Sequence, residues 1–545
     1  MREFTLDLMR LLHFGPRITA AALLLVPILG CSPAASSPGM EQPAEKDTVS
    51  STGEIEELRY KARWRKRRLI FNNDGDDALF FPSDLPATPQ NLLERRTIPV
   101  IGTQVDSIFY CTTQSIGAYT HRSEVSELLV RDLPREGFRN PVGEFAEQGT
   151  DPLEIVTEYC RKEGIEIFAT LRMNDVHDSS DRFSVLGSEF KRKNSRTLFG
   201  SSRKPPPYGY WSGADFSWKV IRNMTFQVLE EMASNYDLDG LELDFWRHPP
   251  YFKTYAWGEP VTQTETDSIT RLMRRVRRMA DARARERGRP LLIAVRVMDS
   301  PELNHDMGLN LVTWLKEDLV DLVIVGEVAL APWEETIRLA HRYGVPVYPC
   351  IRRSMMGEER GSLESFRAQA LTAWKQGADG IYLFNLFPDE DHEQKYRELG
   401  DPNGLERLDK LYSLDPVGRE SFKRYIHDFE KYKAQKPVSP LSPLLLEPDM
   451  TYTVPMYLAD RSLSQAIIGN RPRVQARVQL ENLDPETAVR LSVNGHRLEA
   501  EERVQDELRY SISPTQLQTG YNHFRILVPA GAAPSLKDIL VSVLY

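Results

Sequence analysis

Residues 239–248 read DGLELDFWRH, and this short stretch is the most informative element of the sequence. Because successive side chains of a strand point to opposite faces, Glu242 and Asp244 share one face while the intervening leucines and Phe245 share the other. The apolar face suits a covering layer of helices, so the two carboxylates point into the body of the fold. Buried charge is costly unless it is paired. The stretch therefore predicts a buried strand with a polar site at its C-terminal end.

Similar apolar runs recur along the chain and alternate with segments of helical period. We expect strands at 68–73, 104–111, 165–172, 239–245, 291–297, 320–326, 345–351 and 379–385. Helices are expected between them, for example at 86–96, 152–164, 218–235, 265–287, 332–343 and 362–376. Eight such units over roughly 325 residues match the α/β class and size of a (β/α)8 TIM barrel. A doubly wound open sheet is the alternative, less favoured because no glycine-rich phosphate loop follows the first strand.

The pattern changes after residue 390. Residues 391–435 are charged and expected to be mostly helical, so we assign 66–435 to the barrel with a helical extension. Residues 436–448 (KPVSPLSPLLLEP) contain four prolines and are typical of a linker. Residues 449–545 hold short alternating stretches separated by turns, which predicts a C-terminal antiparallel β-sandwich. That domain either binds glycan or braces the barrel.

The N-terminal residues have the features of a targeting segment. Arginines precede an apolar run at 18–29, which is shorter than the roughly 20 residues that span a bilayer. The run closes with Leu29-Gly30-Cys31, which resembles a bacterial lipobox. The resemblance implies cleavage before Cys31, lipidation of its sulfur and attachment to the bacterial cell envelope, periplasmic or at the surface. A signal peptide cut elsewhere is the alternative.

We accordingly assign 1–31 to a lipoprotein signal peptide and 32–65 to a flexible linker rich in Ser, Pro and Ala. The basic run at 61–68 (KARWRKRR) is interpreted as a solvated segment that leads into the first strand.

The composition excludes several classes of protein. The chain has 545 residues, 69 Lys+Arg against 78 Asp+Glu and a net charge of −9, so it has no global basic footprint for nucleic acid. Four cysteines exclude a disulfide-built scaffold. With Cys31 lipidated, Cys111, Cys160 and Cys350 remain, and at least one thiol must be free. Since no CxxC or Cys/His cluster has metal spacing, we expect no structural metal and no cofactor.

Carboxylates at the strand ends carry the expected chemistry. In a TIM barrel, catalytic groups lie at the C-terminal ends of the strands. Asp244 and Glu327 end the fourth and sixth strands and should face each other across the mouth, with Glu242 in reserve. Glycoside hydrolysis needs one carboxylate as nucleophile or base and one carboxylic acid to protonate the leaving oxygen. The structural alternatives are internal ion pairs with Arg172 or Arg296, and a rim charge for Glu327.

Further residues near the strand ends are expected to bind substrate. They are Asp74, Arg172, Asn174, His177, Trp246, Arg247, His248, Arg296, Tyr348 and Asn385. The arginines, with the basic loop 178–217, favour an anionic glycan, sulfated or uronate-containing. Alternatively, the inner arginines pair with the barrel's own acids. Aromatic residues in the loops after strands three and four, from Tyr208 to Trp211 and from Trp246 to Trp257, either stack on sugar rings or form a core of their own.

The segment DGLELDFWRHP, the lipoprotein leader, the barrel and the terminal sandwich resemble the glycosyl hydrolase-like 10 barrels of bacterial secreted proteins, over roughly residues 65–390. This resemblance implies hydrolysis of a glycosidic bond in a polysaccharide or oligosaccharide.

Three other families share single features with the fourth strand. Asp239-Gly240 followed by inward acids resembles the chitinase-type strand, whose acid would fall at Trp246. The spacing from Gly240 to Asp244 is similar to that of alpha-amylases, although Glu242 stands where that family has Arg. In alpha-galactosidases and alpha-fucosidases, the nucleophile on strand four and the acid on strand six correspond to Asp244 and Glu327 only in topology.

The sequence thus predicts a glycoside hydrolase with a two-carboxylate acid/base mechanism. One alternative is a non-catalytic glycan-binding surface lipoprotein on a degenerate barrel. Another is a metal-dependent hydrolase that uses Asp74, His177, Asp244 and His248, which lacks support from HxH or HExxH spacing.

Overall fold

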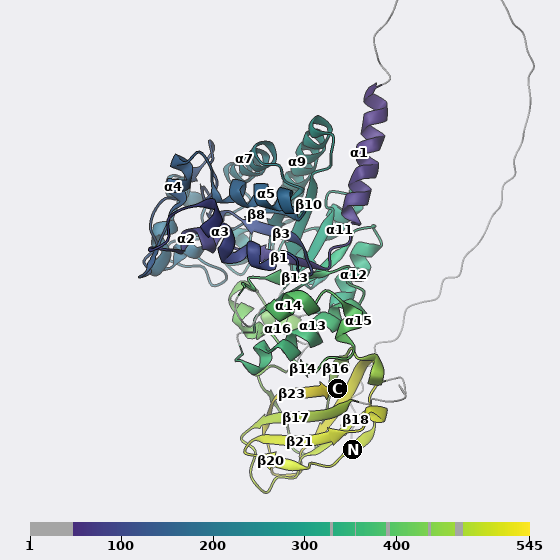
Figure 1. The fold of residues 1–545 in the computed structure, drawn as a ribbon. Coiled ribbons are helices and arrows are strands. Elements are labelled where there is room, and N and C mark those ends of the chain that lie inside the picture. Colours follow the sequence, from purple (N-terminus) through teal and green to yellow (C-terminus); the bar gives the residue numbers. More distant parts are fainter. Residues whose placement is uncertain (1–46, 327–330, 355, 389–392, 434–437, 464–471) are drawn as a thin grey trace, which may run out of the picture. The chain divides into compact units, whose positions relative to one another are not determined.

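Eight parallel strands close into a barrel in the computed structural model, which describes residues 47–326, 331–354, 356–388, 393–433, 438–463 and 472–545 (Figure 1). The strands are β1 (Leu69–Asn73), β3 (Val105–Cys111), β8 (Glu166–Arg172), β9 (Gly240–Asp244), β10 (Leu292–Val297), β11 (Leu322–Val325), β12 (Val347–Arg352) and β13 (Ile381–Phe384). Hydrogen bonding runs from β1 through β3, β8 and onward to β13, which pairs with β1. The TIM barrel is confirmed, and closure shows that the open-sheet alternative is wrong.

Helices connect successive strands and end where the local sequence dictates. The larger ones are α3 (Pro89–Arg96), α5 (Pro152–Glu163), α7 (Lys219–Asn235), α9 (Gln263–Arg287), α12 (Trp333–His341) and α13 (Leu363–Lys375). Asp151 caps α5, and Thr262 forms a capping box with Glu265 at the start of α9. Gly164 and Gly288 end the same two helices in the left-handed conformation that glycine adopts without strain.

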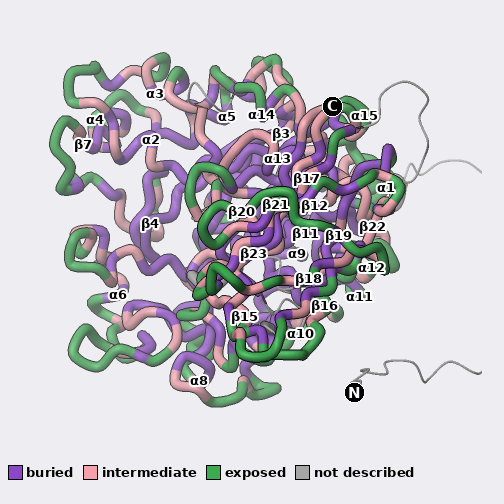
Figure 2. The backbone as a smooth tube through the Cα atoms, turned by 90° about the horizontal axis from the view of Figure 1, so that it is seen from below, coloured by how far each residue is buried: buried purple, intermediate pink, exposed green. Residues whose placement is uncertain are grey.

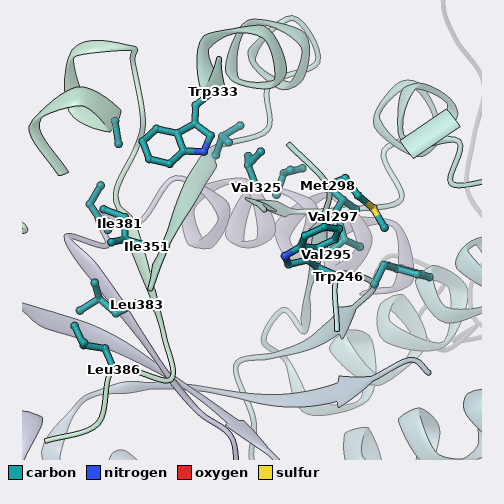
Figure 3. Close-up of a cluster of buried hydrophobic side chains, with 14 of the residues drawn as sticks. Trp246, Val295, Val297, Met298, Val325, Trp333, Ile351, Ile381, Leu383 and Leu386 are labelled. Carbon is teal, nitrogen blue, oxygen red and sulfur yellow. The ribbon is translucent and has the colours of Figure 1, made fainter. Parts of the chain in front are cut away.

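The barrel wall has two different faces. The outward residues are aliphatic and pack beneath the helices; Figure 3 shows Val295, Val297, Val325, Ile351, Ile381 and Leu383 among them. The inward residues form a separate apolar cluster that includes Ile70, Phe109, Phe168 and Tyr382. Phe168 lies against Gly240, where an added Cβ would come within 2.1 Å of the ring. Glycine at 240 is therefore required for this interior to pack.

The N-terminal end of the barrel is closed by a buried ion pair. Arg67 Nε and Nη2 donate to the two carboxylate oxygens of Glu166 at 2.6 and 2.7 Å, and Arg67 Nη1 donates to the Tyr348 hydroxyl at 3.3 Å. Tyr348 is the second residue of β12, so its ring fills the barrel end opposite the mouth. The expectation that Tyr348 binds substrate is corrected by this position, and Arg352 ends the strand instead.

A helix occupies part of the segment expected to be a flexible linker. Helix α1 (Asp47–Arg63) is fixed by Arg59 and Arg63, which form ion pairs with Asp321 at 2.7 and 2.9 Å. Arg63 and Arg67 are buried. The interpretation of 61–68 as a solvated run is therefore wrong for these two arginines, because acidic residues far along the chain pair with them.

Two antiparallel sheets follow the barrel. One joins β14 (Lys410–Ser413), β23 (Ser535–Leu544), β17 (Arg473–Glu481), β21 (Glu507–Ile512) and β20 (Glu502–Val504). The other joins β16 (Thr451–Leu458), β22 (Gly520–Leu527), β18 (Arg490–Val493) and β19 (His496–Leu498). Buried and exposed residues alternate along β17, as in a two-layer sandwich. The first sheet begins with β14, which lies before the expected linker.

The chain divides into two units, 1–48 and 49–545, and the second contains both the barrel and the sandwich. Figure 2 shows buried backbone in the interior and exposed backbone mostly at the outer turns. Within the described residues, no helix is long and apolar enough to cross a bilayer. The expected signal peptide, lipobox and Cys31 lie outside the described residues. Cys111, Cys160 and Cys350 are all buried, and they form no disulfide within the described residues.

Candidate active site at the barrel mouth

Asp244 ends β9 inside the barrel, where its carboxyl group forms an ion pair and accepts hydrogen bonds from the backbone. Arg296, its neighbour on β10, donates through Nε and Nη2 to the two oxygens of Asp244 at 3.0 and 2.8 Å. The backbone N–H groups of Trp246 and Arg247 donate to Asp244 Oδ1 at 3.0 and 2.9 Å. Asp244 is 1% exposed. The ion-pair alternative considered for this residue is therefore present, and it holds a carboxylate at the mouth.

Glu242 lies one layer deeper on the same face of β9. Its Oε2 accepts from Thr170 Oγ1 at 2.6 Å and from the Tyr382 hydroxyl at 3.1 Å. Burial raises the pKa of Glu242 to about 8, and the charge of Asp244 adds to the shift. The side chain is fully buried, and Oε1 has no hydrogen-bond partner in the described part of the chain. Glu242 is therefore a neutral acid at pH 7.

A second pair of acids flanks the turn after β1. Gly75 has a φ of +76°, and an added Cβ would meet the Cys111 carbonyl oxygen at 2.1 Å, so only glycine fits between Asp74 and Asp76. Asp74 accepts from Arg96 Nη1 at 2.6 Å and from Asn385 Nδ2 at 2.9 Å. Asp76 is half-buried. The turn thus places one paired carboxylate beside one partly accessible carboxyl group.

The two acids of this turn have opposite pKa shifts. Burial alone would raise the pKa of Asp74, but the Arg96 and Arg172 guanidiniums outweigh it and hold the pKa below its ordinary value. Burial and the charge of Asp74 raise the pKa of Asp76 to about 7. Asp74 is therefore ionised at neutral pH, while Asp76 is poised to give up or take a proton.

Arg172, at the end of β8, lies between the two acidic pairs. It is next to Asp244 in the strand register, and its charge acts on Asp74 and Asp76. Its Nη1 lies 3.4 Å from Asp175 Oδ2. The β1, β8, β9 and β10 ends thus share one polar network, as the sequence predicts for the C-terminal ends of barrel strands.

Asp175 organises the two histidines at the mouth. Its Oδ1 lies 2.8 Å from His177 Nδ1, and its Oδ2 lies 3.8 Å from His248 Nδ1. Arg247 Nη2 lies 2.9 Å from His177 Nε2. Because arginine can only donate, Nε2 accepts and Nδ1 carries the hydrogen that Asp175 accepts. Burial lowers the pKa of His248, and the neighbouring Arg247 charge lowers it further.

Asp175, His177 and His248 are also the one group among the described residues whose ligand atoms could share a metal ion, all within 4.8 Å of one another. The surroundings fit a cation poorly. A divalent ion would have to displace the hydrogen bond between His177 and Asp175 while two guanidiniums, Arg172 and Arg247, lie in contact with the same groups. The set expected for a metal-dependent hydrolase is not assembled either, because Asp74 and Asp244 are held by Arg96 and Arg296.

The mouth is covered by residues from the helical extension. Phe422, in the helical turn η6 (Arg419–Tyr425), stacks on Trp246 with ring centroids 5.3 Å apart. The ring centroid of Tyr425 lies 5.9 Å from that of Tyr210 and 6.3 Å from that of His248. Five polar residues at the mouth keep partial solvent exposure, namely Asp76, His177, Arg247, Arg352 and Asn385. A ligand at the barrel end would meet these five first.

Several buried polar atoms at the mouth have no hydrogen-bond partner in the described structure. They are Asn72 Nδ2 and Oδ1, Glu242 Oε1, Trp246 Nε1 and Asn385 Oδ1. Asn72 follows Ile70 on the inward face of β1, and it is 1% exposed. Buried amides without partners are rare unless a ligand or water completes them. These atoms therefore make the end of the barrel a candidate polar binding site.

The remaining sequence expectations have mixed outcomes. Glu327 lies outside the described residues. Asn174 has a structural role. Its Nδ2 donates to Pro250 O at 2.7 Å and its Oδ1 accepts from the Ala214 N–H at 2.8 Å, so it connects two loops. Tyr251, Phe252 and Tyr255 are buried and form the core of their own loop. Of the arginines expected at an anionic substrate, Arg296 and Arg172 are paired with acids of the barrel.

Sequence reasoning assigned no role to Asp76, Asn72 or Phe422, although Asn72 belongs to the polar end of the first strand. Asp76 could have been found, because NNDGDD places an acid directly after the glycine of a tight turn at a strand end. Asn72 is a polar residue at an inward position of β1, which alternation alone indicates. Phe422 carries no local signal, since its contact with Trp246 joins residues 176 positions apart in the numbering.

No protein-family model matches this sequence, and no curated protein does. Among solved structures, the chain is similar to a variant of the GH36 alpha-galactosidase AgaA from Geobacillus stearothermophilus (11% identity, 88% of this chain and 58% of that one, TM-score 0.36). It is also similar to alpha-L-fucosidase isoenzyme 2 from Paenibacillus thiaminolyticus (13%, 62% and 49%, 0.39) and to the PgaB (BpsB) glycoside hydrolase domain from Bordetella bronchiseptica (14%, 62% and 99%, 0.36).

These structural neighbours are glycoside hydrolases. The chain spans 58% of the length of the alpha-galactosidase and 49% of the fucosidase. At these identities and TM-scores, the likeness carries no inference about substrate or mechanism.

Proposed function

We propose that the protein is a glycoside hydrolase whose active site is the C-terminal mouth of the barrel. The observation that carries the proposal is an ion-paired carboxyl group and a carboxyl group of raised pKa at the same mouth. Arg296 holds Asp244 as a carboxylate, whereas burial and Asp74 raise the pKa of Asp76 to about 7. Hydrolysis of a glycosidic bond needs one carboxylate and one carboxylic acid at the same site.

In this proposal Asp244 supplies the carboxylate that attacks the anomeric carbon or activates water. Asp76 supplies the proton for the leaving oxygen, because it is partly accessible and half protonated near neutral pH. Glu327, the acid expected from the sequence, is the alternative proton donor. Arg247, His177 and Asn385, which keep partial exposure, then orient the sugar at the mouth. Trp246 was expected to bind substrate, but it is 4% exposed and stacks on Phe422.

We also propose that the substrate is anionic. The inner arginines Arg296 and Arg172 give this proposal little support, because both pair with acids of the protein. The proposal now depends on the exposed basic side chains of the loop at 182–204, such as Arg182, Lys193 and Arg203. A second candidate function, glycan binding without turnover, is favoured by one observation. Asp244 is 1% exposed and already accepts four hydrogen bonds.

The test is the release of reducing ends from neutral, uronate and sulfated polysaccharides by the full chain and by Asp76→Asn and Asp244→Asn. We expect each substitution to lower kcat by at least about a hundredfold, as loss of a general acid or nucleophile does. Activity of the wild type should fall as pH rises through about 7, because the protonated form of Asp76 is the donor. Asp76→Asn should lose less on aryl glycosides, whose leaving groups need no proton.

The control is Asp84→Asn, which removes an exposed carboxyl group in the same loop and should leave activity unchanged. Full activity of Asp76→Asn with an unaltered pH profile would assign the acid to another residue, such as Glu327. Binding without reducing-end release by the wild type would favour the glycan-binding alternative.

We also propose that the chain is a lipoprotein of the bacterial cell envelope, anchored through Cys31. The support is the sequence ILGC at the end of the apolar run. Labelling with radioactive palmitate should mark the wild type, and Cys31→Ser should abolish the label. A label that persists in this variant would contradict the proposal.

A further inference from the structure

A pocket separate from the barrel mouth lies between the barrel helices and the sandwich. It has a volume of about 160 Å³, and its walls come from α12, α13, β14 and β16 together with Tyr521 of β22. A cavity of about 150 Å³ is large enough to hold a six-membered ring. The lining shares no residue with the barrel mouth described above, so a ligand here would leave the catalytic carboxyl groups free.

The walls of this pocket combine aromatic faces with polar atoms that lack partners. Trp333, Tyr457 and Tyr521 line it, and the last two rings pack edge to face at 5.2 Å. Three lining residues carry a buried polar atom without a hydrogen-bond partner in the described structure: Trp333 Nε1, Gln376 Oε1 and Ser413 Oγ. Trp333 is 8% exposed. The lining thus offers one hydrogen-bond donor, one acceptor and one hydroxyl group. A ligand that carries both donors and acceptors would satisfy all three.

The charges around the pocket favour an uncharged ligand. None of the described residues that line it is charged. At its edge the acidic residues Glu334 and Glu335 act on Tyr521, whose pKa burial and these charges raise to about 12. An anion would be repelled, and a purely apolar ligand would leave the three polar atoms buried without hydrogen bonds. A pyranose ring has an apolar C–H face for the aromatic rings and hydroxyl groups that both donate and accept.

We propose that this pocket binds one uncharged sugar residue of a glycan chain, as a non-catalytic site formed jointly by the barrel and the sandwich. The proposal deepens the proposed function and rests on it only for the choice of a glycan as ligand. It also gives the sandwich a role in binding through β16 and β22, in addition to its packing on the barrel.

The test is affinity electrophoresis of the full chain in gels that contain a neutral polysaccharide, such as galactomannan, xyloglucan or laminarin, or a sulfated one. We expect retardation by at least one neutral polysaccharide. Tyr521→Ala should weaken the apparent affinity about tenfold, and Ser413→Ala several-fold. Tyr343→Ala is the matched control, because it removes an exposed tyrosine (38% exposed) that does not line the pocket. Thermal unfolding midpoints identify any variant that fails to fold.

The outcomes separate this inference from the proposed function. Retardation that Asp76→Asn abolishes and Tyr521→Ala preserves would overturn the second site while favouring the mouth. Retardation lost in Tyr521→Ala and Ser413→Ala but kept in Asp76→Asn would support it, even if no polysaccharide is hydrolysed. Binding only to sulfated polysaccharide, displacement of the glycan by decanoate, or no retardation in any gel would each overturn the proposal.

Discussion

Two pairs of acidic residues, Asp74 with Asp76 and Glu242 with Asp244, have the same spacing in the sequence. In the structure, both pairs combine an acid that is paired with an arginine and an acid whose pKa is raised. In each pair one carboxylate is held by an arginine, Arg96 for Asp74 and Arg296 for Asp244. Burial and the held charge then raise the pKa of the other acid, to about 7 for Asp76 and about 8 for Glu242. The difference between the two pairs is access, since Asp76 is half-buried and Glu242 fully buried.

The buried acid Glu242 gives a prediction about stability. Its folded pKa of about 8 lies above the unfolded value of 4.5, so the folded state binds more protons between these two values. Stability should therefore fall as pH rises through this window, on the order of 3 kcal/mol between pH 5 and pH 8. Glu242→Gln keeps the shape without the charge and should abolish most of this fall, as measured by guanidinium unfolding at both pH values.

The comparison at pH 5 is the internal control, because Glu242 is then protonated and the variant and the wild type should have similar stability. Parallel pH profiles of the two proteins would show that Glu242 is not the buried acid responsible.

Among the elements, the eight strands and the larger helices of the barrel could be predicted because their signals are local. Strand alternation, the caps Asp151 and Thr262, and the glycines that end α5 and α9 all act within a few residues. Two elements could not be predicted in this way. Helix α1 depends on Asp321, more than two hundred residues away, and β14 has only four residues and pairs with the last strand of the chain.

For the site, sequence alone could predict the inward direction of Glu242 and Asp244 and their place at a strand end. It could not predict which acid of each pair would be paired with an arginine, because Arg96 and Arg296 lie on other elements. The same reason explains Asn174. An amide at a strand end is equally suited to substrate or to loop carbonyls, and only the packed loops decide.

The helical turn η6 gives a prediction at the element scale. Phe422 stacks on Trp246 and is itself 9% exposed. Phe422→Ala should remove this cover, destabilise the protein by about 3 kcal/mol and open Trp246 to solvent. We expect a red shift of tryptophan emission and stronger quenching by acrylamide. The same substitution in a Trp246→Phe background should leave emission unchanged, and quenching that does not respond in the wild-type background would contradict the contact.

At the scale of the whole molecule, one buried polar cluster holds the sandwich together, and a second contact joins the sandwich to the barrel. In one, Asp460 accepts from Lys410 Nζ at 2.9 Å, from the Tyr412 hydroxyl at 2.5 Å and from the Tyr545 hydroxyl at 2.8 Å. In the other, Arg360 Nη2 donates to Asp538 Oδ2 at 2.7 Å, which links the segment after β12 to β23. Because the pair of Arg360 and Asp538 is buried and joins the barrel to the sandwich, the two domains should unfold as coupled parts rather than independently.

The pair of Arg360 and Asp538 allows this coupling to be measured. Both residues are buried, so Arg360→Ala should lower the free energy of unfolding by about 3–5 kcal/mol, because it leaves a buried carboxylate without its ion pair. Arg360→Ala combined with Asp538→Ala should lower it by less than the sum of the two single changes. Burial raises the pKa of Asp538 to about 6 even beside Arg360. The coupling energy from this double-mutant cycle, determined by chemical unfolding, should therefore be larger at pH 7.5 than at pH 5, where the carboxyl group is protonated. Additive single changes at pH 7.5 would contradict the coupling of Arg360 to Asp538.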